Sequence, residues 1–396
     1  MSLHGRQHRI VCSFTNQDAA ALETIDANSV LFRLQAGHNT GPSITEYYRD
    51  IDETGTETYL EESAPTPVAV EYTKGAQMAG DDTSLAFWSY WATQGAAASS
   101  SAQLDTSGVY ELIWFGPSTT PQARAFSMGD IGQPSTTDTD FNRDVYNATP
   151  ERVVISGSRR GLITVAADIR AGRSVGTSTD YSALGNHYRV NIFNFGMTHV
   201  FTSTTLGQQS VPGTTWFAEE LDTDTEILAA TELDGTPVSL TSALMEFSLE
   251  MTQGLDLQRS YAPGNLTAAN AGYVPASGDW IYDNNGQQIE LEMLFRQNDS
   301  AGSNVVETLI AESEAGTRRA WELWFVDPDA VGDTSDSHYG FKCTLYQCGP
   351  ANSFTEENDG FGERYVRARY KAQWHAVDDV GWHFAAGSAM ATALGG

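Results

Sequence analysis

Residues 243–252 (ALMEFSLEMT) and 288–296 (QIELEMLFR) decide the fold that we expect for this chain. Apolar and polar side chains alternate in both stretches, and a period of two is typical of a β-strand with one buried and one wet face. The wet parity carries glutamates at 246, 250, 290 and 292, so the two strands predict a sheet whose exposed face is acidic. The apolar parity, predicted to form the core face, comprises Met245, Phe247, Leu249, Met251, Ile289, Leu291, Met293 and Phe295.

A polar stretch, residues 253–287, separates these strands and is predicted to be a long loop. Carboxylates on a wet face beside a long loop fit two arrangements. One is a wall that lines a polar space, and the other is an ordinary half-solvated antiparallel sheet. The alternation alone favours the ordinary sheet.

The charge balance of the 396-residue chain is strongly acidic. It has 51 acidic against 22 basic residues, a formal net charge of -29, and only three lysines, Lys74, Lys342 and Lys371. The acids are scattered and form no tail. Scattered acid with little lysine is typical of proteins that work in concentrated salt, where screening tolerates self-repulsion. We therefore expect a halophilic source, and such a surface disfavours a protein that grips duplex DNA.

The sequence lacks the signals of export and membrane insertion. The first fourteen residues contain no apolar run of signal-peptide length, and no segment approaches the ~18 apolar residues of a membrane span. We expect a soluble protein that is not exported by a signal peptide. Three cysteines, Cys12, Cys343 and Cys348, are too few for a disulfide scaffold.

One strand–helix–strand pattern occurs twice. The strand 68–72, the helix 85–94 and the strand 109–117 match the strand 289–293, the helix 305–313 and the strand 320–328, and Glu111 matches Glu322. We interpret this as a duplicated β unit with one helix in each copy. The predicted first domain is 1–205 with an N-terminal arm and long loops, the acidic connector is 206–234, and the second domain is 235–396 with a C-terminal tail.

The helix at 85–94 has an N-cap candidate at residues 81–83 and an aromatic surface. Phe87, Trp88 and Trp91 cover much of its circumference, so we expect this helix to be buried under a sheet or against a neighbouring subunit.

Motifs that carry chemistry are missing from the sequence. It has no phosphate-binding loop, no H-E-x-x-H and no G-x-S-x-G, and its eight histidines show no metal-ligand spacing. The acidic turn from Asp327 to Asp336 departs from the calcium-loop pattern at Val331 and His338. The four wet-face glutamates could form a general acid and base pair, but nothing nearby separates their pKa values. We predict no catalytic residue, no metal and no cofactor; the favoured role is assembly.

These stretches resemble the major tail tube proteins of long-tailed, siphovirus-like viruses, in the form whose tube domain is duplicated. The resemblance rests on SALMEFSLEMTQGLDL (242–257), the long loop, GQQIELEMLFR (286–296) and the helix and strands that follow. ERVVISGSRRGLITVAADIRAG (151–172) is similar to the strand pair of the first copy. With the salt-adapted composition, the resemblance implies a virus of a halophilic archaeon.

The resemblance implies a mainly β fold of two sandwich or barrel domains, each flanked by one α-helix, with long loops. Four strands of each domain would close across subunits into a barrel around a channel. A trimeric ring with pseudo-sixfold symmetry is favoured over a hexamer, and rings would stack through the long loop and the terminal arms. Implied partners are the tape measure, tail terminator and baseplate proteins, and double-stranded DNA would pass through the tube without specific binding. The protein would be made in the host cytoplasm and located in the virion tail.

In such a tube, Glu246, Glu250, Glu290 and Glu292 would face the lumen as a like-charged wall that does not hold phosphates. Arg159, Arg160 and Arg170 in the first copy depart from this acidic pattern. Two alternatives remain: another virion protein, such as a tail terminator or a capsid decoration, or a β-sandwich that binds or cleaves carbohydrate. Nine tryptophans are the only support for the carbohydrate alternative, and most of them lie in strand or helix patterns, where core packing explains them.

Overall fold

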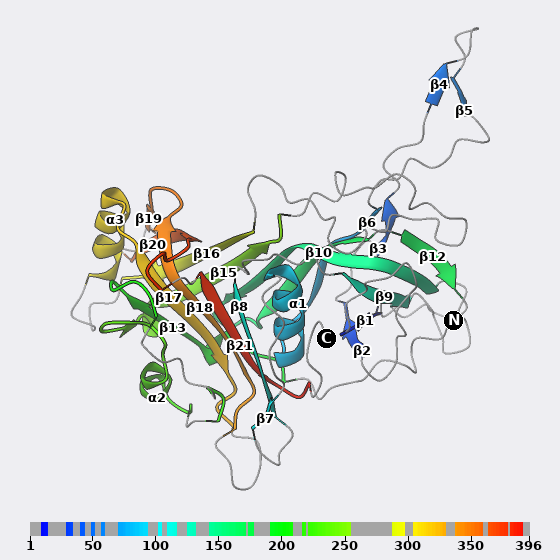
Figure 1. Cartoon of the computed structure of the whole chain (residues 1–396). Helices are drawn as coiled ribbons and strands as arrows, with labels where there is room; N and C mark the ends of the chain where they lie inside the picture. The colour runs from blue at the N-terminus through cyan, green and yellow to red at the C-terminus, as the bar shows by residue number, and fades with distance from the viewer. Residues whose placement is uncertain are drawn as a thin grey trace.

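The computed structural model describes residues 9–14, 29–34, 40–43, 49–51, 57–59, 70–93, 102–104, 109–116, 125–131, 142–171, 173–177, 191–208, 216–218, 221–254, 287–297, 304–329, 337–358, 363–378 and 381–390. The expected mainly β fold class is confirmed, and all strand pairs are antiparallel (Figure 1). Most of the predicted long loop, at 255–286, and both chain ends lie outside these residues, as do residues 330–336 of the acidic turn.

The strands of the first sheet, sheet I, run in the order β3-β6-β11-β10-β15-β16-β20-β19. Two of its inner strands, β15 and β16, are the stretches with the clearest alternation. The bounds of its strands are β3 Thr40–Ser43, β6 Val70–Ala79, β10 Asn142–Ser158, β11 Thr164–Ala171, β15 Leu244–Thr252, β16 Gln288–Arg296, β19 Thr355–Asn358 and β20 Arg364–Ala372.

The second sheet, sheet II, runs in the order β14-β13-β17-β18-β21-β8-β7. It joins sheet I where the last residues of β18 pair with the end of β20. The bounds of its strands are β7 Ala102–Gln103, β8 Tyr110–Gly116, β13 Thr198–Ser203, β14 Val238–Ser239, β17 Arg319–Val326, β18 Gly340–Pro350 and β21 Trp382–Ser388.

The long strand β10 belongs to two sheets. Its second half lies between β11 and β15, whereas its first half pairs with β9 and β12 in a smaller sheet of order β2-β1-β9-β10-β12. Besides the first half of β10, the smaller sheet contains β1 Arg9–Ser13, β2 Ser29–Arg33, β9 Phe126–Ile131 and β12 Arg173–Thr177. Among the described residues, the short strands β4 Arg49–Ile51 and β5 Glu57–Tyr59 pair only with each other.

Sheets I and II pack face to face around one hydrophobic core. Phe247 of β15 stacks near Phe325 of β17, with ring centroids 5.3 Å apart, and Phe295 of β16 lies 6.0 Å from Trp321. Seven of the eight residues of the predicted core face, all except Met245, are buried here. Met245 is half-buried because a bulge in the pairing between Leu244 and Glu246 shifts the parity at the start of β15, and Leu244 occupies the core instead.

The helix α1 (Asp82–Thr93) lies inside the molecule, between sheet II and the smaller sheet (Figure 1). Its rings contact Phe32 of β2, Phe126 of β9 and Trp114 of β8. Phe87, Trp88 and Trp91 are fully buried, as the aromatic helix surface predicts, and the covering elements belong to the same chain. Asp81 caps the helix, because its side chain accepts a hydrogen bond from Ser84 N at 2.7 Å.

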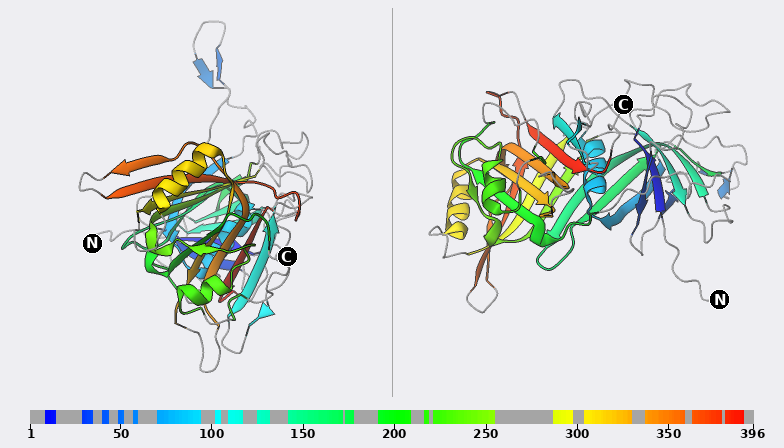
Figure 2. Two further views of the ribbon diagram at one scale, coloured as in Figure 1. Left: turned by 90° about the vertical axis from the view of Figure 1, so that its left-hand side faces the viewer. Right: turned by 90° about the horizontal axis from the view of Figure 1, so that it is seen from below.

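Two further α-helices lie on the outside. The helix α3 (Val305–Ala315) is capped by Asn304 and ends at Gly316, whose φ of 66° is readily adopted by glycine. It packs beside β20 and β16, at the end of the molecule away from the smaller sheet (Figure 2). The helix α2 (Asp224–Ala229) lies within the predicted acidic connector and starts with a capping box of Thr223 and Glu226. Short 3-10 helices occupy η2 Phe195–Met197 and η3 Thr241–Ala243.

Hydrogen-bonded pairs cross the predicted domain boundary at 205–234. β10 pairs with β15, β13 with β17 and β8 with β21, so the strands of both halves form continuous sheets. Cys12, Cys343 and Cys348 are free and buried. In the part of the chain that is described, no helix has the length and apolar character that crossing a membrane requires.

Candidate functional site: the wet face of sheet I and the buried ionic cluster

The wet face of sheet I carries an ordered set of ion pairs. Glu250 on β15 lies directly across from Glu290 on β16, and each is held by an arginine from the strand beyond. Arg152 of β10 donates to both carboxylate oxygens of Glu250, at 2.7 and 2.9 Å, and Arg369 of β20 bonds Glu290. Arginine is suited to this role because its planar fork matches a carboxylate.

The same pattern continues toward the edge strand β19. Arg367 of β20 donates to Glu292 at 3.0 Å and to Glu357 of β19 at 2.9 Å, and lies 3.8 Å from Glu246. Lys371 bonds the side chain of Gln288 at 2.7 Å. All four predicted lumen glutamates therefore lie on one face, with half-exposed side chains that are paired to cations.

The expectation of a wall with no basic groups is therefore wrong for the described strands. Arg152, Arg367, Arg369 and Lys371 stand among the glutamates. The sequence pattern of β15 and β16 shows only acid, because the basic partners come from the neighbouring strands β10 and β20. The hydrogen bonds from Arg152 lower the pKa of Glu250. The face is thus close to charge-balanced, and most of the net charge of -29 is carried elsewhere.

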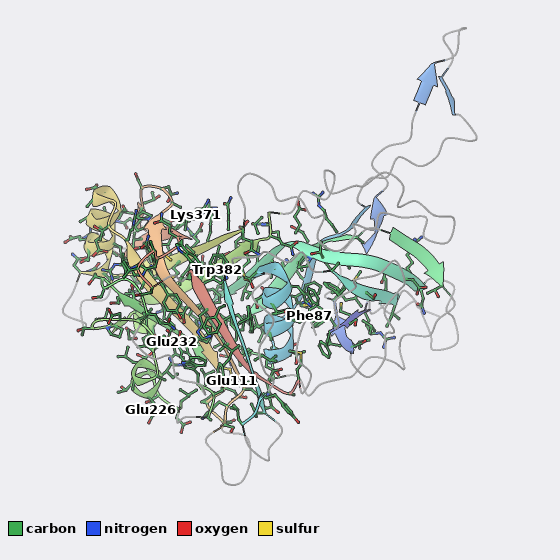
Figure 3. The ribbon with its side chains drawn as sticks, in the orientation of Figure 1. Phe87, Glu111, Glu226, Glu232, Lys371 and Trp382 are labelled. Carbon is green, nitrogen blue, oxygen red and sulfur yellow. The ribbon has the colours of Figure 1, made fainter. Side chains whose placement is uncertain are left out.

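A second charged group lies on the opposite side of the molecule, under the predicted connector (Figure 3). The inner strands of sheet II, β17, β18 and β21, are buried on both faces: one face packs on sheet I, and the other is covered by residues 216–218 and 221–233 with α2. Charged side chains lie between sheet II and this cover. We call them the buried ionic cluster: Glu111 of β8, Glu322 of β17, Lys342 of β18 and His383 of β21, with Glu232 from the connector.

Lys342 and Glu232 form the centre of the buried ionic cluster. Lys342 Nζ lies 2.8 Å from Glu232 Oε1, and both side chains are excluded from water. Glu232 Oε2 also accepts a hydrogen bond from the hydroxyl of Tyr346 at 2.7 Å and lies 2.8 Å from His383 Nδ1. The ammonium group lies 4.2 Å from the ring centroid of Trp216 and 5.0 Å from that of Trp324, within cation–π range.

Glu111 and Glu322, the residues matched by the sequence repeat, hold the connector on sheet II at two places. Glu111 Oε1 accepts hydrogen bonds from Trp216 N at 2.7 Å and Phe217 N at 3.3 Å. Glu322 Oε2 accepts from Glu232 N at 3.1 Å and from the hydroxyl of Thr344. These buried carboxylates therefore satisfy backbone donors that would otherwise lack partners.

The pKa values indicate how the cluster is charged. Burial raises the pKa of Glu111 to about 7 and raises that of Glu322. Burial would also raise the pKa of Glu232, but the charge of Lys342 and the contact with His383 outweigh it and lower that pKa to about 2. Burial lowers the pKa of His383, which favours the neutral imidazole. At neutral pH the cluster contains one ion pair, Glu232 with Lys342, and burial shifts the neighbouring carboxyls of Glu111 and Glu322 toward their protonated forms.

Carboxylates, a lysine and a histidine at close range can perform acid–base chemistry only where a substrate reaches them. Here every member of the buried ionic cluster is at most 2% exposed, and rings cover them: Phe115 stacks on His383 at 4.3 Å, and Trp216 lies 4.8 Å from it. The geometry is that of a structural network which fixes the connector.

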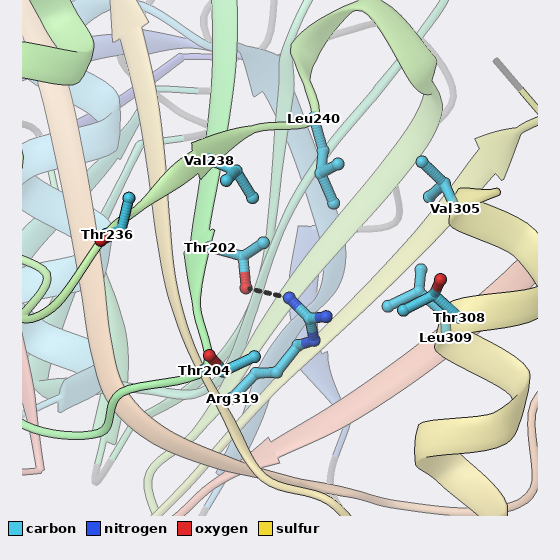
Figure 4. Close-up of a pocket in the computed structure, with 9 residues that line it drawn as sticks. All are labelled: Thr202, Thr204, Thr236, Val238, Leu240, Val305, Thr308, Leu309 and Arg319. Atoms are coloured by element: carbon cyan, nitrogen blue, oxygen red, sulfur yellow. Dashed lines mark hydrogen bonds between the residues drawn. The ribbon is translucent and has the colours of Figure 1, made fainter. Parts of the chain in front are cut away.

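A cavity of about 290 Å³ lies elsewhere, between α3 and the β13–β14 pair (Figure 4). Arg319 is its charged residue, and Glu312 of α3 neutralises it through bonds of 2.5 and 2.7 Å. Thr202 accepts a further, longer bond of 3.4 Å from the same guanidinium. The wall is otherwise threonine and aliphatic: Thr202, Thr204, Thr236, Val238, Leu240, Val305, Thr308 and Leu309.

Among the residues that the structure describes, no three His, Cys, Asp or Glu side chains are grouped as metal ligands would be. No protein-family model matches the chain, and no curated protein is significantly similar to it in sequence. The site assignment therefore depends on the geometry above.

Sequence reasoning missed the buried ionic cluster. Alternating Glu, Lys and His in β8, β17, β18 and β21 has the same pattern as a wet face, and the covering layer comes from a distant part of the chain. The repeat that matches Glu111 with Glu322 was the one available signal, because both carboxylates anchor the connector in the same way.

Proposed function

We propose that this protein is a structural subunit that assembles with copies of itself into stacked rings, forming the tail tube of a long-tailed virus. The channel of that tube would be the path of the genome, and the wet face of sheet I would line it. The strand order of sheet I is the observation that carries the proposal.

The first four strands of sheet I come from the first half of the chain and the last four from the second half. In the first half, β3, β6, β11 and β10 lie side by side, and β10 and β11 form a hairpin. In the second half, β15, β16, β20 and β19 follow in the corresponding order, and β19 and β20 pair as consecutive strands. In each half, a helix follows the second strand of the set: α1 follows β6, and α3 follows β16. This agreement supports a duplicated unit.

The duplication makes the two edges of sheet I complementary. Where the halves meet, β10 pairs with β15 over seven residue pairs, from Arg152–Thr252 to Ser158–Glu246. By the same correspondence β19 is equivalent to β10, and β3 is equivalent to β15. β19 of one copy can therefore pair with β3 of the next copy, as β10 pairs with β15 inside the chain. Such pairing removes free edges, which otherwise invite aggregation, and closes a ring.

An acidic wall would repel DNA through its like charge. The wet face suits a DNA conduit for a different reason, because its arginines are already paired with glutamates. A lumen of free arginines would bind phosphates, since phosphate contacts dominate affinity for DNA. Here Arg152 is engaged by Glu250, Arg369 by Glu290, and Arg367 by Glu292 and Glu357. Each of these three arginines already has an anionic partner, so the face has little net attraction for a passing duplex.

The carbohydrate alternative loses most of its support. Trp88, Trp91, Trp114, Trp321 and Trp324 are fully buried, so none of these rings can act as a sugar platform.

Imaging of the purified protein tests the proposal. Negative-stain micrographs in molar salt are expected to show rings with a central channel and stacks of such rings, and sedimentation should show a concentration-dependent assembly. A species that stays monomeric at every concentration would overturn the proposal. Rings that never stack would favour the tail terminator.

A variant pair on β19 tests the edge directly. Successive residues of an edge strand direct their N–H groups alternately inward and outward, and proline removes this donor. We therefore expect that one of Glu356→Pro and Glu357→Pro keeps the melting curve of the wild type but forms no rings. If both variants fold and assemble normally, β19 is not the joining edge.

A further inference from the structure

The turn between β10 and β11 presents two arginines that differ from those of the wet face. Arg159 and Arg160 are exposed, and in the described part of the chain no hydrogen bond or ion pair engages either side chain. By contrast, Arg152 and Arg170, on the two strands that lead to this turn, each bond a glutamate. Two free cations side by side are unusual for a chain of net charge -29.

The turn is held rigidly. Arg159 N donates to Met245 O of β15 at 3.1 Å, and Gly161 N donates to Ser158 O at 2.9 Å. The segment before β13 supports it from the other side, through Phe195 N to Gly161 O at 3.0 Å. Arg160 has a φ of 65°, the left-handed region that non-glycine residues adopt at some cost. The two side chains therefore project from a fixed base, which lowers the entropy cost of binding a partner.

Apolar side chains flank the arginines. Leu162 is 53% exposed and Ile192 is 45% exposed, two of the most exposed large apolar residues described. Both belong to the same supported region, because Leu162 bridges to Asn194 and Ile192 bridges to Asp81. Arg159, Arg160, Leu162 and Ile192 together form what we call the arginine tip, a cationic and apolar patch typical of protein contact sites.

We propose that the arginine tip docks onto an acidic surface of a second copy of this chain in the next ring, and so joins rings along the tube. This inference rests on the proposed function, because it takes for granted that copies of the chain form rings. It assigns the arginine tip to the contact between one ring and the next. The lateral edges of sheet I are β3 and β19, whereas the tip lies at the strand ends, where Ser158 pairs with Glu246 near the start of β15. A ring closed through its lateral edges turns its strand ends toward the rings above and below.

Charge complementarity favours a second copy of this chain over a nucleic acid as the partner of the arginine tip. Copies of a chain with 51 acidic residues offer many carboxylates to an unpaired guanidinium. A nucleic acid would meet two arginines but also the repulsion of the remaining surface, so it is the weaker partner.

Charge reversal at the tip provides the test. Arg159→Glu, Arg160→Glu and the double variant are compared with wild type for ring formation by sedimentation and for stack length by negative stain. We expect rings to form as in wild type, while the fraction of stacked rings falls by roughly tenfold or more, since each lost charge contact is multiplied around a ring. Arg159→Lys with Arg160→Lys keeps the charge and should retain most stacking.

Arg318→Glu is the matched control. Arg318 is exposed and also lacks a partner within the described residues, but it precedes β17 and lies outside the arginine tip. Rings of the Arg318→Glu variant should therefore stack as wild-type rings do. Unchanged stacks in the tip variants, or an equal loss in Arg318→Glu, would overturn the inference while leaving ring formation intact. If the wild type forms no rings, the proposed function fails, and this inference fails with it. A labelled 30-base-pair duplex that binds wild type but not the tip variants would assign the tip to nucleic acid instead.

Discussion

Glutamates meet cationic side chains in two regions of this molecule, with different consequences. On the wet face of sheet I, the Glu250 side chain is 29% exposed and its partner Arg152 is 47% exposed. In the buried ionic cluster, Glu232 is 2% exposed and Lys342 is 0% exposed. The distances are alike, at 2.7 and 2.8 Å, so geometry does not separate the two pairs. The two pairs differ in their access to water.

Solvation sets what each pair contributes. An exposed pair exchanges water for a partner at little net gain, typically about 0–1 kcal/mol. A buried pair has already lost its water, so removing one partner leaves an uncompensated charge and costs about 3–5 kcal/mol. The wet face can therefore vary its pairs while the fold persists, whereas the buried ionic cluster fixes the connector in one position.

Lys342→Met is expected to have the largest effect. Met approximates the length of the Lys side chain but leaves Glu232 buried without its cation, so we expect about 3–5 kcal/mol of lost unfolding free energy. Chemical denaturation at pH 7 measures it. Lys371→Met, on the wet face, is the control and should cost less than about 1 kcal/mol. Equal losses in the two variants would mean that burial does not distinguish the regions.

Glu111→Gln is expected to have the second largest effect, on pH dependence. The folded pKa of Glu111, about 7, lies above its ordinary value of 4.5 because of burial. The folded state then binds the proton more tightly than the unfolded state, so stability falls as pH rises from about 4.5 to about 7 and levels off above. The full span is on the order of 3 kcal/mol.

Gln keeps a carbonyl oxygen for Trp216 N but does not titrate. Melting curves between pH 5 and 8 should therefore show a smaller loss of stability in Glu111→Gln than in wild type. Part of the slope should remain, because the pKa of Asp81 is also raised to about 7, by burial and by neighbouring Asp82. An unchanged slope would show that Glu111 is ionised throughout this range.

The sequence predicted the strands of sheet I well because that sheet has one wet face. Alternation in β16 identifies its four buried side chains, since nothing disturbs the register there. Met245 was misassigned because a bulge is a local change of register that a period of two cannot reveal. Phe87 and Trp91 were predictable as buried, because aromatic rings around a whole helix cannot all face water.

Sheet II could not be predicted to the same degree. In β17 and β18 every residue but Pro350 is buried, although Glu322, Lys342 and Thr344 interrupt the apolar pattern. Those polar residues are buried because the connector folds back over them, and no local pattern encodes a contact between Lys342 and Glu232, which lie 110 positions apart in the chain. The arginine partners of the wet face were missed for a similar reason, since β10 supplies Arg152 to β15 across almost a hundred residues.

Glu250→Gln is expected to have the smallest effect, and it sharpens the comparison within a single strand. The substitution removes a charge that is half-exposed and paired to Arg152, so the loss should stay below about 1 kcal/mol. Raising the salt from 0.1 to 1 M should reduce even that difference, since the Debye length falls from about 10 to about 3 Å. Phe247→Ala, three residues earlier on the core face, should instead cost about 3–5 kcal/mol at either salt concentration. If denaturation curves gave the two variants the same loss, β15 would not have one wet face and one core face, and the lining that we assign to the channel would have to be sought on another surface.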